Sequence, residues 1–405
     1  MTELIVFDDA VARTWAPFAL TRPIGELLFG ALVQRARLER VVGAPCAGYL
    51  GCPELAGFEE PGAPPVLTGE PAADRARVYL CSRVVPDWGA SVRWPAERAA
   101  VLIDGRVAGW YVPGGASAPA PAVLADPTSA AVPGPPLELP GRWLEHVWNL
   151  VTENAEQVVA DFGALSDPAV NPTPPSDAIG FRPGMLHLGA QVVLEPGVVL
   201  DFSEGPIWLD DRVTVRAFTR LAGPAFVGPD TVLLGGPYSH VSVGPGCKVH
   251  GELEASVILG YSNKAHDGFL GHAYLGRWVN LGAMTTNSDL KNNYGTVRLW
   301  TPAGTVDTGE MKLGCLLGDH VKTGIGALLN TGTVVGAGAN LFGTAMPPKY
   351  VPPFSWGSGE DLERYDIEKF LVTAELAMAR RRQHLSEAMK RLLREAWQRD
   401  PGVPA

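Results

Sequence analysis

A six-residue repeat begins near residue 186 and constrains the fold more than any other feature of the sequence. Its units include "LGAQVV", "LEPGVV", "LGDHVK" and "LNTGTV", which begin with an aliphatic residue and usually continue with a glycine, a small or an acidic residue. Three such units per turn form a triangular coil, in which one aliphatic side chain per face points inward and glycine-rich corners turn the chain. Stacked turns then bury a continuous core that no single repeat makes alone.

An antiparallel sandwich is the main alternative for a repetitive, strand-rich segment of this kind. It would show strict alternation of apolar and polar residues, with turns about every 8 to 12 residues. The six-residue phase instead persists over more than a dozen units. The sequence therefore predicts a parallel β-helix over residues 186–356, and the hexapeptide pattern resembles that of the left-handed kind.

Residues 1–165 have a different sequence pattern, with strand-like and helix-like segments, which predicts a small α/β domain. "LIVFDD" (4–9) is an apolar run that ends in two aspartates, which is typical of a buried strand with acids at its C-terminal end. Residues 24–42 place apolar residues at helical spacing, and "AAVLIDGRVAGWYV" (99–112) predicts two strands joined by an Asp-Gly hairpin turn. An amphipathic helix is expected over 142–165.

Segments rich in proline and alanine separate these parts. Residues 113–142 hold too few apolar residues to bury a core of their own, which predicts a flexible insert in the N-terminal domain. A Pro-rich linker is expected over 166–185, between this domain and the β-helix. After the repeats, residues 357–405 are expected to contain a long amphipathic helix over 361–397, with a basic run at 380–382.

The charge and composition of the chain limit the kinds of partner that it can bind. The formal charge of −10 argues against a protein that binds nucleic acids non-specifically, because such binding requires a basic surface. No basic leader begins the chain, and no window reaches the roughly 18 apolar residues that span a bilayer. The five cysteines show no C-x-x-C spacing, which indicates reduced, partly buried thiols. We therefore expect a cytoplasmic protein with small-molecule substrates and with no nucleic-acid or membrane partner.

The repeat breaks over residues 263–295, "NKAHDGFLGHAYLGRWVNLGAMTTNSDLKNNYG". An excursion from a regular coil forms a loop on one edge, and loops on rigid scaffolds are where binding sites usually form. The stretch carries imidazoles, amides and lysines, which bind polar small molecules, although histidines are often structural and asparagines often fill left-handed corners. A metal site at His266, His272, Asp267 and Asp289 is disfavoured, because no H-x-x-x-H or cysteine pair supports it.

Within this stretch, "KAHDGFLGHAYLGRWVNLGAMT" resembles the acetyltransferase half of the bifunctional enzymes that make UDP-N-acetylglucosamine. That family has a left-handed β-helix with a histidine, a short gap to a Leu-Gly step, and a "VNIGAGT"-like hexad followed by an Asn-Tyr loop. The resemblance implies that His266 is the catalytic histidine and that Asn280 lies in the substrate site. Phe269 takes a position where the family has tyrosine. His272 falls on a position with no catalytic role in the family and is expected to be structural.

Other substrate-binding candidates depend on looser matches to the same family. Its Asn-Tyr loop matches this chain loosely near residue 293, where a lysine is a candidate for binding the phosphate. The family's basic residues in the coil before the histidine have no clear counterpart, and two arginines in earlier coils are candidates to replace them in space. These further candidates are Lys291, Asn293, Tyr294, Arg216 and Arg220.

The implied chemistry is acetyl transfer from acetyl-CoA to the amine of an amino-sugar phosphate. The ammonium form of the sugar must lose a proton, and an imidazole is the natural general base near neutral pH. A backbone N–H at a coil corner would stabilise the tetrahedral oxyanion. The resemblance also implies a homotrimer, with acetyl-CoA between coils of adjacent subunits and the C-terminal helix helping to close the site.

The N-terminal segment "FDD…PFALTRPIGELLFGALVQRARLE" resembles a divergent branch of the same enzymes. In that branch an "LTRP-x-x-EL-x-x-G" segment replaces the usual Gly-rich nucleotide loop. If nucleotidyl transfer is retained, Asp8 and Asp9 are the candidates for Mg²⁺, Arg22 for a phosphate and Glu26 for support. The alternative is that the aspartates cap a strand end and the "TRP" residues form a turn.

Three functions follow from these patterns. The first is a sugar-1-phosphate acetyltransferase with an additional nucleotidyltransferase activity, in the synthesis of UDP-N-acetylglucosamine or a related nucleotide sugar. The second keeps only the nucleotidyl step, as a uridylyl- or thymidylyltransferase that uses UTP or dTTP and has a non-catalytic β-helix. The third is a non-catalytic solenoid scaffold. His266 and Asn280 together argue against the scaffold, which has no need of an ordered polar loop.

Overall fold

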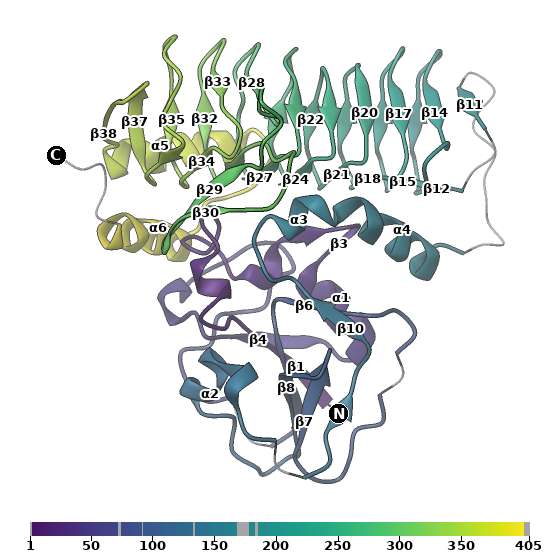
Figure 1. Cartoon of the computed structure of the whole chain (residues 1–405), viewed down its shortest axis with the longest axis vertical. Helices are drawn as coiled ribbons and strands as arrows, with labels where there is room; N and C mark the ends of the chain where they lie inside the picture. The colour runs from purple at the N-terminus through teal and green to yellow at the C-terminus, as the bar shows by residue number, and fades with distance from the viewer. Residues whose placement is uncertain are drawn as a thin grey trace.

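The computed structural model describes residues 2–71, 74–90, 92–132, 134–167, 178–182 and 185–400. A three-sided parallel β-helix lies across one end of an N-terminal α/β domain, and two C-terminal helices lie against both parts (Figure 1). Most of the linker predicted over 166–185 lies outside the described residues. The predicted fold class, an α/β domain followed by a left-handed parallel β-helix and C-terminal helix, is confirmed.

The N-terminal domain is built on a mixed six-stranded sheet. Its first strand lies between two parallel neighbours and is completely buried from Leu4 to Phe7, which explains the continuous apolar run in the sequence. The Asp-Gly hairpin is confirmed, with positive φ angles of 52° at Asp104 and 68° at Gly105. In sheet order the strands are β4 (Cys46–Leu50), β1 (Thr2–Phe7), β5 (Ala76–Cys81), β8 (Arg106–Val112), β7 (Ala99–Ile103) and β9 (Leu137–Glu138).

The helix predicted over 24–42 is wrong in its first half. Ile24–Glu26 form one 3-10 turn, a short hairpin of β2 (Leu28–Phe29) and β3 (Leu32–Val33) follows, and the α-helix α1 spans only Gln34–Val42. Gly30 turns this hairpin with a φ of 67°, and its N–H donates to the side-chain oxygen of Asn154. A side chain at this position would collide with Asp161, so tertiary contacts override the helical spacing.

The insert predicted to be flexible over 113–142 contains ordered elements. A short helix, α2 (Pro121–Ala125), begins with a proline at its first position and buries Leu124. The strand β9 then pairs with β7 in parallel, and Leu139 is buried behind it. The helix predicted over 142–165 begins later than expected, after β10 (Gly141–Trp143) has paired with β6 (Val84–Pro86). Its helical part is α3 (Asn149–Thr152) and α4 (Asn154–Leu165).

The coil of the β-helix has three faces, which we number by the order in which the chain meets them. The first face holds β11 (Ile179–Phe181), β14 (Val199–Asp201), β17 (Arg220–Ala222), β20 (Pro237–Ser239), β23 (Leu253–Glu254) and β26 (Leu270–Gly271). The second face holds β12 (Leu186–Leu188), β15 (Ile207–Leu209), β18 (Ala225–Val227), β21 (Ser242–Val243), β24 (Val257–Gly260), β27 (Tyr274–Arg277), β31 (Leu316–Leu317), β34 (Val334–Val335) and β36 (Tyr350–Val351).

The third face is interrupted at the polar stretch and is completed by single bridges from Asn263 through Asn280 to Lys322. Its strands are β13 (Val193–Leu194), β16 (Thr214–Val215), β19 (Val232–Leu233), β22 (Lys248–Val249) and β25 (Asn263–Lys264), then β32 (Lys322–Thr323), β35 (Asn340–Leu341), β37 (Ser355–Ser358) and β38 (Asp361–Arg364). β28 (Thr286–Asn287) stacks on β26 and pairs with β33 (Leu328–Leu329), which continues the first face. The excursion after β28 adds a hairpin of β29 (Arg298–Thr301) and β30 (Gly304–Asp307).

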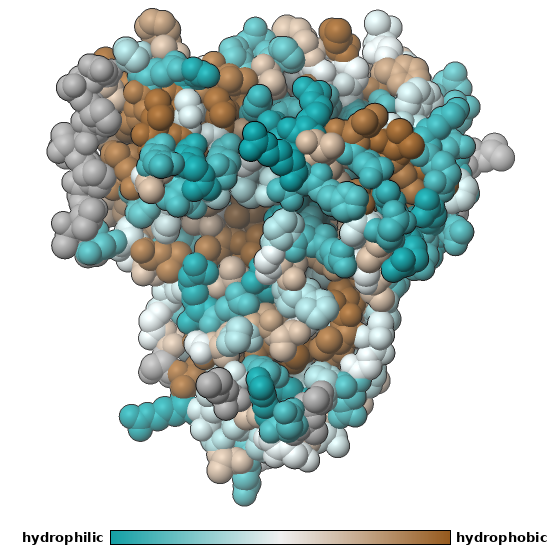
Figure 2. Space-filling view, turned by 180° about the vertical axis from the view of Figure 1, so that it is seen from behind, coloured by the Kyte–Doolittle hydropathy of each residue, from teal (hydrophilic) through white to brown (hydrophobic). Residues whose placement is uncertain are grey.

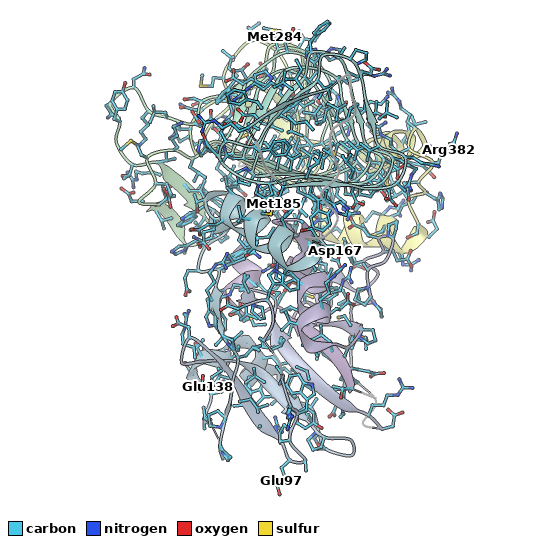
Figure 3. All side chains as sticks on the ribbon, turned by 90° about the vertical axis from the view of Figure 1, so that its right-hand side faces the viewer. Glu97, Glu138, Asp167, Met185, Met284 and Arg382 are labelled. Atoms are coloured by element: carbon cyan, nitrogen blue, oxygen red, sulfur yellow. The ribbon has the colours of Figure 1, made fainter. Side chains whose placement is uncertain are left out.

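Inward-facing aliphatic residues stack in columns, as the repeat predicts. On the second face the column runs through Val243, Ile258, Leu275, Leu317 and Val335, all buried in one hydrophobic cluster. Figure 3 looks along this coil and shows Met284 at the corner farthest from the N-terminal domain. The first coils expose apolar side chains, which are brown in Figure 2. These exposed residues are Ile179, Phe181, Met185 and Val193.

The outward side of the second face is also buried, because the N-terminal domain covers it. Tyr274, Leu316 and Val334 share a hydrophobic cluster with Phe18 and Leu28 of the N-terminal domain. The Tyr274 hydroxyl donates to the carbonyl of Leu28 at 3.1 Å. The two parts of the chain therefore share a core and are packed in a fixed orientation.

The long C-terminal helix predicted over 361–397 is two helices, α5 (Ile367–Ala379) and α6 (Glu387–Arg399). The break falls at the basic run, where Arg382 has a φ of 56°, and the Ser386 side chain caps α6 by accepting from the N–H of Met389. α6 packs into the core of the N-terminal domain through Met389, Leu392 and Leu393. None of the helices in the described ranges is long and apolar enough to cross a membrane.

The inward column provides a stability test. Leu275→Ala removes a fully buried side chain and should lower the free energy of unfolding by about 2–5 kcal/mol. Leu328→Ala makes the same change at a side chain that is 47% exposed, and should cost less than about 0.5 kcal/mol. Chemical denaturation followed by circular dichroism measures both values. Equal losses would contradict the placement of Leu275 in the core.

Candidate functional site

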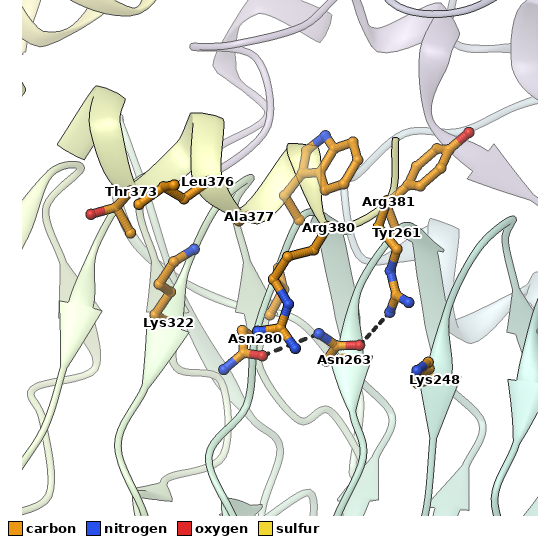
Figure 4. Close-up of a pocket in the computed structure, with 12 residues that line it drawn as sticks. Lys248, Tyr261, Asn263, Asn280, Lys322, Thr373, Leu376, Ala377, Arg380 and Arg381 are labelled. Carbon is orange, nitrogen blue, oxygen red and sulfur yellow. Dashed lines mark hydrogen bonds between the residues drawn. The ribbon is translucent and has the colours of Figure 1, made fainter. Parts of the chain in front are cut away.

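A groove lies between α5 and the third face of the β-helix (Figure 4). Its volume is about 370 Å³. Side chains of successive coils form the floor, the C-terminal end of α5 forms the roof, and two aromatic rings form a wall. It brings together residues more than 100 positions apart in the sequence, such as Asn263 and Arg381.

The floor is a ladder of polar side chains. Lys248, Asn263, Asn280 and Lys322 occupy the same outward position on four successive coils. Parallel strands lie about 4.8 Å apart, so these side chains follow one another at that spacing. The Asn263 amide donates to the side-chain oxygen of Asn280 at 3.3 Å, and Arg381 from the helix side donates to the side-chain oxygen of Asn263 at 2.5 Å. Figure 4 shows both contacts as dashed lines.

The aromatic wall consists of Tyr261 and Trp278, which are corner residues of neighbouring coils. Their rings are stacked with centroids 4.6 Å apart and planes within 17°. Both residues have positive φ angles, 53° and 63°, which turn the chain and direct the side chains outward. Arg277 places its guanidinium 5.5 Å from the centre of the Tyr261 ring. The wall offers a flat apolar surface at the edge of a polar groove.

The groove has a strong positive charge. Lys248, Lys322, Arg380 and Arg381 line it, and none of its described lining residues is a carboxylate. Burial lowers the pKa of Lys322 to about 8, so the protein holds this ammonium where water compensates its charge poorly. Burial also lowers the pKa of Arg381. Such a site gains most from an anion with more than one negative charge.

His266, the predicted base, lies on the corner that follows β25 and is exposed. It stands three positions after Asn263, which limits the distance between their backbones to about 11 Å. The corner is held from inside the coil by Lys264, which is 2% exposed and donates to the carbonyls of His266 at 2.9 Å and of His250 at 2.6 Å. His266 therefore lies on the same coil as the groove but does not line it.

His272 has the more ordered environment of the two histidines. Its Nδ1 lies 2.8 Å from a carboxylate oxygen of Asp289, a residue that the excursion brings over this corner. Burial raises the pKa of Asp289, but the hydrogen bond with His272 together with the charges of His272 and Lys312 outweighs this, and the pKa lies below its usual value. An imidazole oriented by a carboxylate has the geometry of a general base. In the sequence these two residues, 17 positions apart, appear together only in the disfavoured metal site, and their pairing as imidazole and carboxylate was not predicted.

The other candidates from the polar stretch do not reach the groove. The Phe269 ring lies against Gly271, and Lys291 donates to the carbonyl of Thr296 within its own loop. Asn293 accepts from the N–H of Gly295 at 3.1 Å, and Tyr294 is 68% exposed. Of the substrate-binding candidates, Asn280 alone lines the groove.

Arg216 and Arg220 lie in earlier coils and are held by acids of those coils. Arg216 pairs with Glu195, and Arg220 pairs with Asp201. Arg220 directly precedes Leu221, which is three strands from Leu270 on the first face, a distance of about 14 Å. The structure does not bring these arginines to either histidine.

The acids predicted to bind Mg²⁺ are engaged in the fold. Asp9 accepts from Arg83 at 2.5 Å and from the N–H of Ala12 at 2.8 Å. Asp8 accepts from Arg13 and from the N–H of Ile24, both at 3.2 Å, and burial raises its pKa. Mg²⁺ requires open oxygen ligands together with several waters. Asp8 and Asp9 are already paired with Arg13 and Arg83, so they do not fit such a site as arranged here, although Oδ1 of Asp8 is buried without a hydrogen-bond partner among the described residues.

Arg22 and Glu26, predicted for the nucleotide, are also paired. Glu26 accepts from Arg35 at 2.7 Å and from the Tyr49 hydroxyl at 2.6 Å. Arg22 is 2% exposed and binds Glu60 and Asp319. Neither side chain is open to a phosphate.

The N-terminal domain has a pocket of its own, of about 440 Å³, beside the carboxyl end of β4. Ligands of open α/β sheets usually bind at this edge, where the strand order reverses between β4 and β5 around β1. The lining consists mostly of small and apolar residues, with Glu70 as its charged member among the described residues.

The structure therefore belongs to the class of hexapeptide-repeat β-helix proteins. Its β-helix carries a cationic groove and is joined to an α/β domain. Residues 4–168 match the profile of the family described as sugar nucleotidyl transferase. The chain is 30% identical over 95 residues to the bifunctional sugar-1-phosphate nucleotidylyltransferase/acetyltransferase of Sulfurisphaera tokodaii, which is 24% of each chain. It is 30% identical over 184 residues to the bifunctional protein GlmU of a Synechococcus species, which is 44% of this chain and 35% of the relative. With GlmU of Nitrosospira multiformis it is 29% identical over 178 residues, 38% of this chain and 35% of the relative.

The resemblance inferred from the sequence is confirmed. Residues 4–168 are similar to sugar nucleotidyl transferases, and parts of the chain are similar to GlmU-like bifunctional proteins, at modest identity. It spans between 24% and 35% of the length of these relatives. A solved UDP-N-acetylglucosamine acyltransferase of Arabidopsis matches with a TM-score of 0.26 and 14% identity, over 51% of this chain and 79% of that one. These values are too low to relate the two chains.

The charge of the groove predicts a pH dependence that Lys322 controls. Its ammonium, with a pKa of about 8, is charged at about pH 7 and mostly neutral at about pH 9. Binding of sulfate, which stays doubly charged over this range, should weaken by up to about tenfold as the pH rises. Calorimetric titration of the wild type and of Lys322→Met measures this change.

Lys322→Met should bind sulfate weakly at both pH values and lose most of the pH dependence. Lys312→Met is the matched control, because Lys312 is half-exposed, pairs with Glu254 and lies outside the groove. If Lys312→Met weakens sulfate binding as much as Lys322→Met does, sulfate does not bind at Lys322 in the groove.

Proposed function

We propose that the chain is an acyltransferase that transfers an acetyl group from acetyl-CoA to the amine of an amino-sugar phosphate. The observation that carries this proposal is the cationic groove on the same coil as His266. Acetyl-CoA is a polyanion with phosphates at one end, and four cations in a groove without described carboxylates match that charge. Its adenine ring can contact the edge of the aromatic wall, where Tyr261 and Trp278 line the groove, although the ring faces pack on each other and Trp278 is only 8% exposed.

The amide ladder supplies the rest of the recognition. Asn263 and Asn280 each carry a donor and an acceptor on the floor of the groove, and a chain of hydrogen bonds ties them to Arg381. An extended donor molecule lying along successive coils meets one such side chain about every 4.8 Å. The groove therefore favours a long, flexible acyl carrier over a compact ligand.

In the reaction His266 accepts a proton from the ammonium group of the sugar. The freed amine nitrogen attacks the thioester carbonyl carbon, and the carbonyl electrons move to the oxygen of a tetrahedral intermediate. A backbone N–H at a coil corner stabilises this oxyanion. The intermediate then collapses: its nitrogen loses a second proton, the carbon–sulfur bond breaks, the thiolate of CoA leaves and takes up a proton, and His266 releases its own proton to water. Exposure of His266 leaves room for the sugar from outside the coil, as a site shared between the subunits of a homotrimer requires.

Nucleotidyl transfer is the second candidate function, and the match of residues 4–168 to sugar nucleotidyl transferases favours it. The pocket at the carboxyl end of β4 is the place for a nucleotide in the N-terminal domain. The paired state of Asp8, Asp9 and Arg22 argues against the metal and phosphate sites that the sequence indicates. Pyrophosphate release with UTP or dTTP and a sugar 1-phosphate tests this half separately.

His266→Ala should lower the rate of CoA release from acetyl-CoA and glucosamine 1-phosphate roughly 100- to 10,000-fold, because the amine then lacks its base. The affinity for CoA should change little, since His266 does not line the groove. A thiol assay measures the rate. Absence of CoA release from the wild type would refute the acyltransferase proposal for this substrate.

His272→Ala, measured in the same assay, distinguishes the role of His272 from that of His266. If His272 is structural, its loss should lower the thermal stability, because Asp289 loses a partner at 2.8 Å, and should leave the rate within a few fold of wild type. If His272→Ala loses the reaction rate and His266→Ala keeps it, the general base is His272 and not His266.

Arg380→Gln should raise the KM for acetyl-CoA about tenfold or more, since hydrogen bonds to charged groups contribute about 1.5–3 kcal/mol. Figure 4 shows its side chain reaching from the roof toward Asn280 and Asn263. Arg382→Gln is the matched control, because Arg382 is exposed and lies outside the groove. Equal KM values for the two variants would place the acyl donor elsewhere.

A further inference from the structure

Four buried charges join the N-terminal domain to the β-helix. Arg22 donates to Asp319 at 2.9 Å through Nε and to Glu60 at 2.8 and 3.0 Å through its two terminal nitrogens. Arg277 lies 3.2 Å from Glu60, and its backbone N–H donates to the other oxygen of Asp319 at 2.8 Å. Thr21 also donates to Asp319, at 2.7 Å. The cluster contains two cations and two carboxylates and is formally neutral.

This arrangement leaves Arg22 no capacity for a ligand. Its side chain is 2% exposed, and all three of its guanidinium nitrogens donate to carboxylates. A phosphate would have to displace Glu60 or Asp319 from Arg22 and bring a further negative charge into a cluster that is now formally neutral, which is strongly unfavourable. The "LTRP" segment is therefore used for contact between the two parts of the chain.

The charged cluster is in direct contact with the aromatic wall of the groove through Arg277. Arg277 contacts Glu60 with one side of its guanidinium and lies over the ring of Tyr261, 5.5 Å from its centre. The next residue, Trp278, stacks on Tyr261 at 4.6 Å. The ring of Trp278 also lies nearly parallel to that of His320, with centroids 6.3 Å apart, and His320 follows Asp319 in the chain. Two residues of the cluster are thus covalent neighbours of rings that form or support the wall.

We propose that Arg22 is a positioning residue through which the N-terminal domain fixes the aromatic wall of the groove, so that the "LTRP" segment acts as an interdomain clamp. The proposal rests on the proposed function only in taking an acyl-CoA as the ligand of the groove. Without Arg22, Glu60 and Asp319 repel each other, and Arg277 turns toward them and leaves the face of Tyr261. The wall then loses its fixed position, although no residue of the groove itself has changed.

Arg22→Met tests the clamp, with Arg37→Met as the matched control. Arg37 is equally buried and donates to Asp161 at 2.7 Å, but its cluster lies inside the N-terminal domain, away from the groove. Hydrogen exchange of the full chain without ligand is the first measurement. Arg22→Met should speed exchange at residues 261–264 and 277–281, whereas Arg37→Met should speed exchange near 29–42 and leave the wall unchanged.

The second measurement is the Kd for CoA, well below the melting temperature of each variant. Arg22→Met should weaken binding about 3- to 30-fold, in the range found for residues that act through others. Arg37→Met should lower the melting temperature with CoA affinity within twofold of wild type. If Arg22→Met does not fold, Arg22→Met combined with Asp319→Asn also removes the repulsion between Glu60 and Asp319, and should show both effects to a smaller degree, because the contacts that Arg22 makes between the two parts are still lost.

The outcomes separate the clamp from the acyltransferase proposal. If the wild type binds no CoA but Arg22→Met speeds hydrogen exchange at the wall, the clamp proposal is supported and CoA is the wrong ligand. If Arg22→Met leaves exchange at the wall unchanged, or if Arg37→Met weakens CoA binding to the same degree, the clamp is overturned.

Discussion

In-register stacking of a six-residue repeat is the constraint on which the rest of this structure depends. Every coil presents the same position of its hexads at the same place, about 4.8 Å from the coil before it. A residue type that recurs at one position therefore becomes a continuous column. Aliphatic residues at the inward position form the core, apolar residues on the outward side of the second face form the contact with the N-terminal domain, and polar residues on the third face form the floor of the groove.

The sequence predicted most of this framework and little of the groove. The hexads predicted the coil because their phase depends on local steric rules, and the Asp-Gly turn predicted its hairpin for the same reason. The groove was missed because its lysines look like isolated surface residues and because α5 closes it from the far end of the chain. Aligned hexads do carry the signal, since "CKV", "SNK", "VNL" and "VKT" each place a polar residue before the inward one.

Contacts between distant parts of the chain account for the sequence predictions that failed. The segment over 24–33 is a turn and hairpin because it meets the second face of the coil, and its helical spacing could not reveal that partner. The C-terminal helix breaks at its arginines, one of which reaches into the groove, and Ser386 was an N-cap signal available in the sequence. The predicted base His266 remains untested, while the structure adds an oriented imidazole at His272.

A structure of the protein with bound CoA tests the central claim most directly. The account predicts that the CoA phosphates lie between α5 and the third face, near Arg380 and Lys322, with the thiol directed along the coil toward the corner of His266. Binding of CoA in the pocket beside β4, or on the coil with the groove empty, would contradict it.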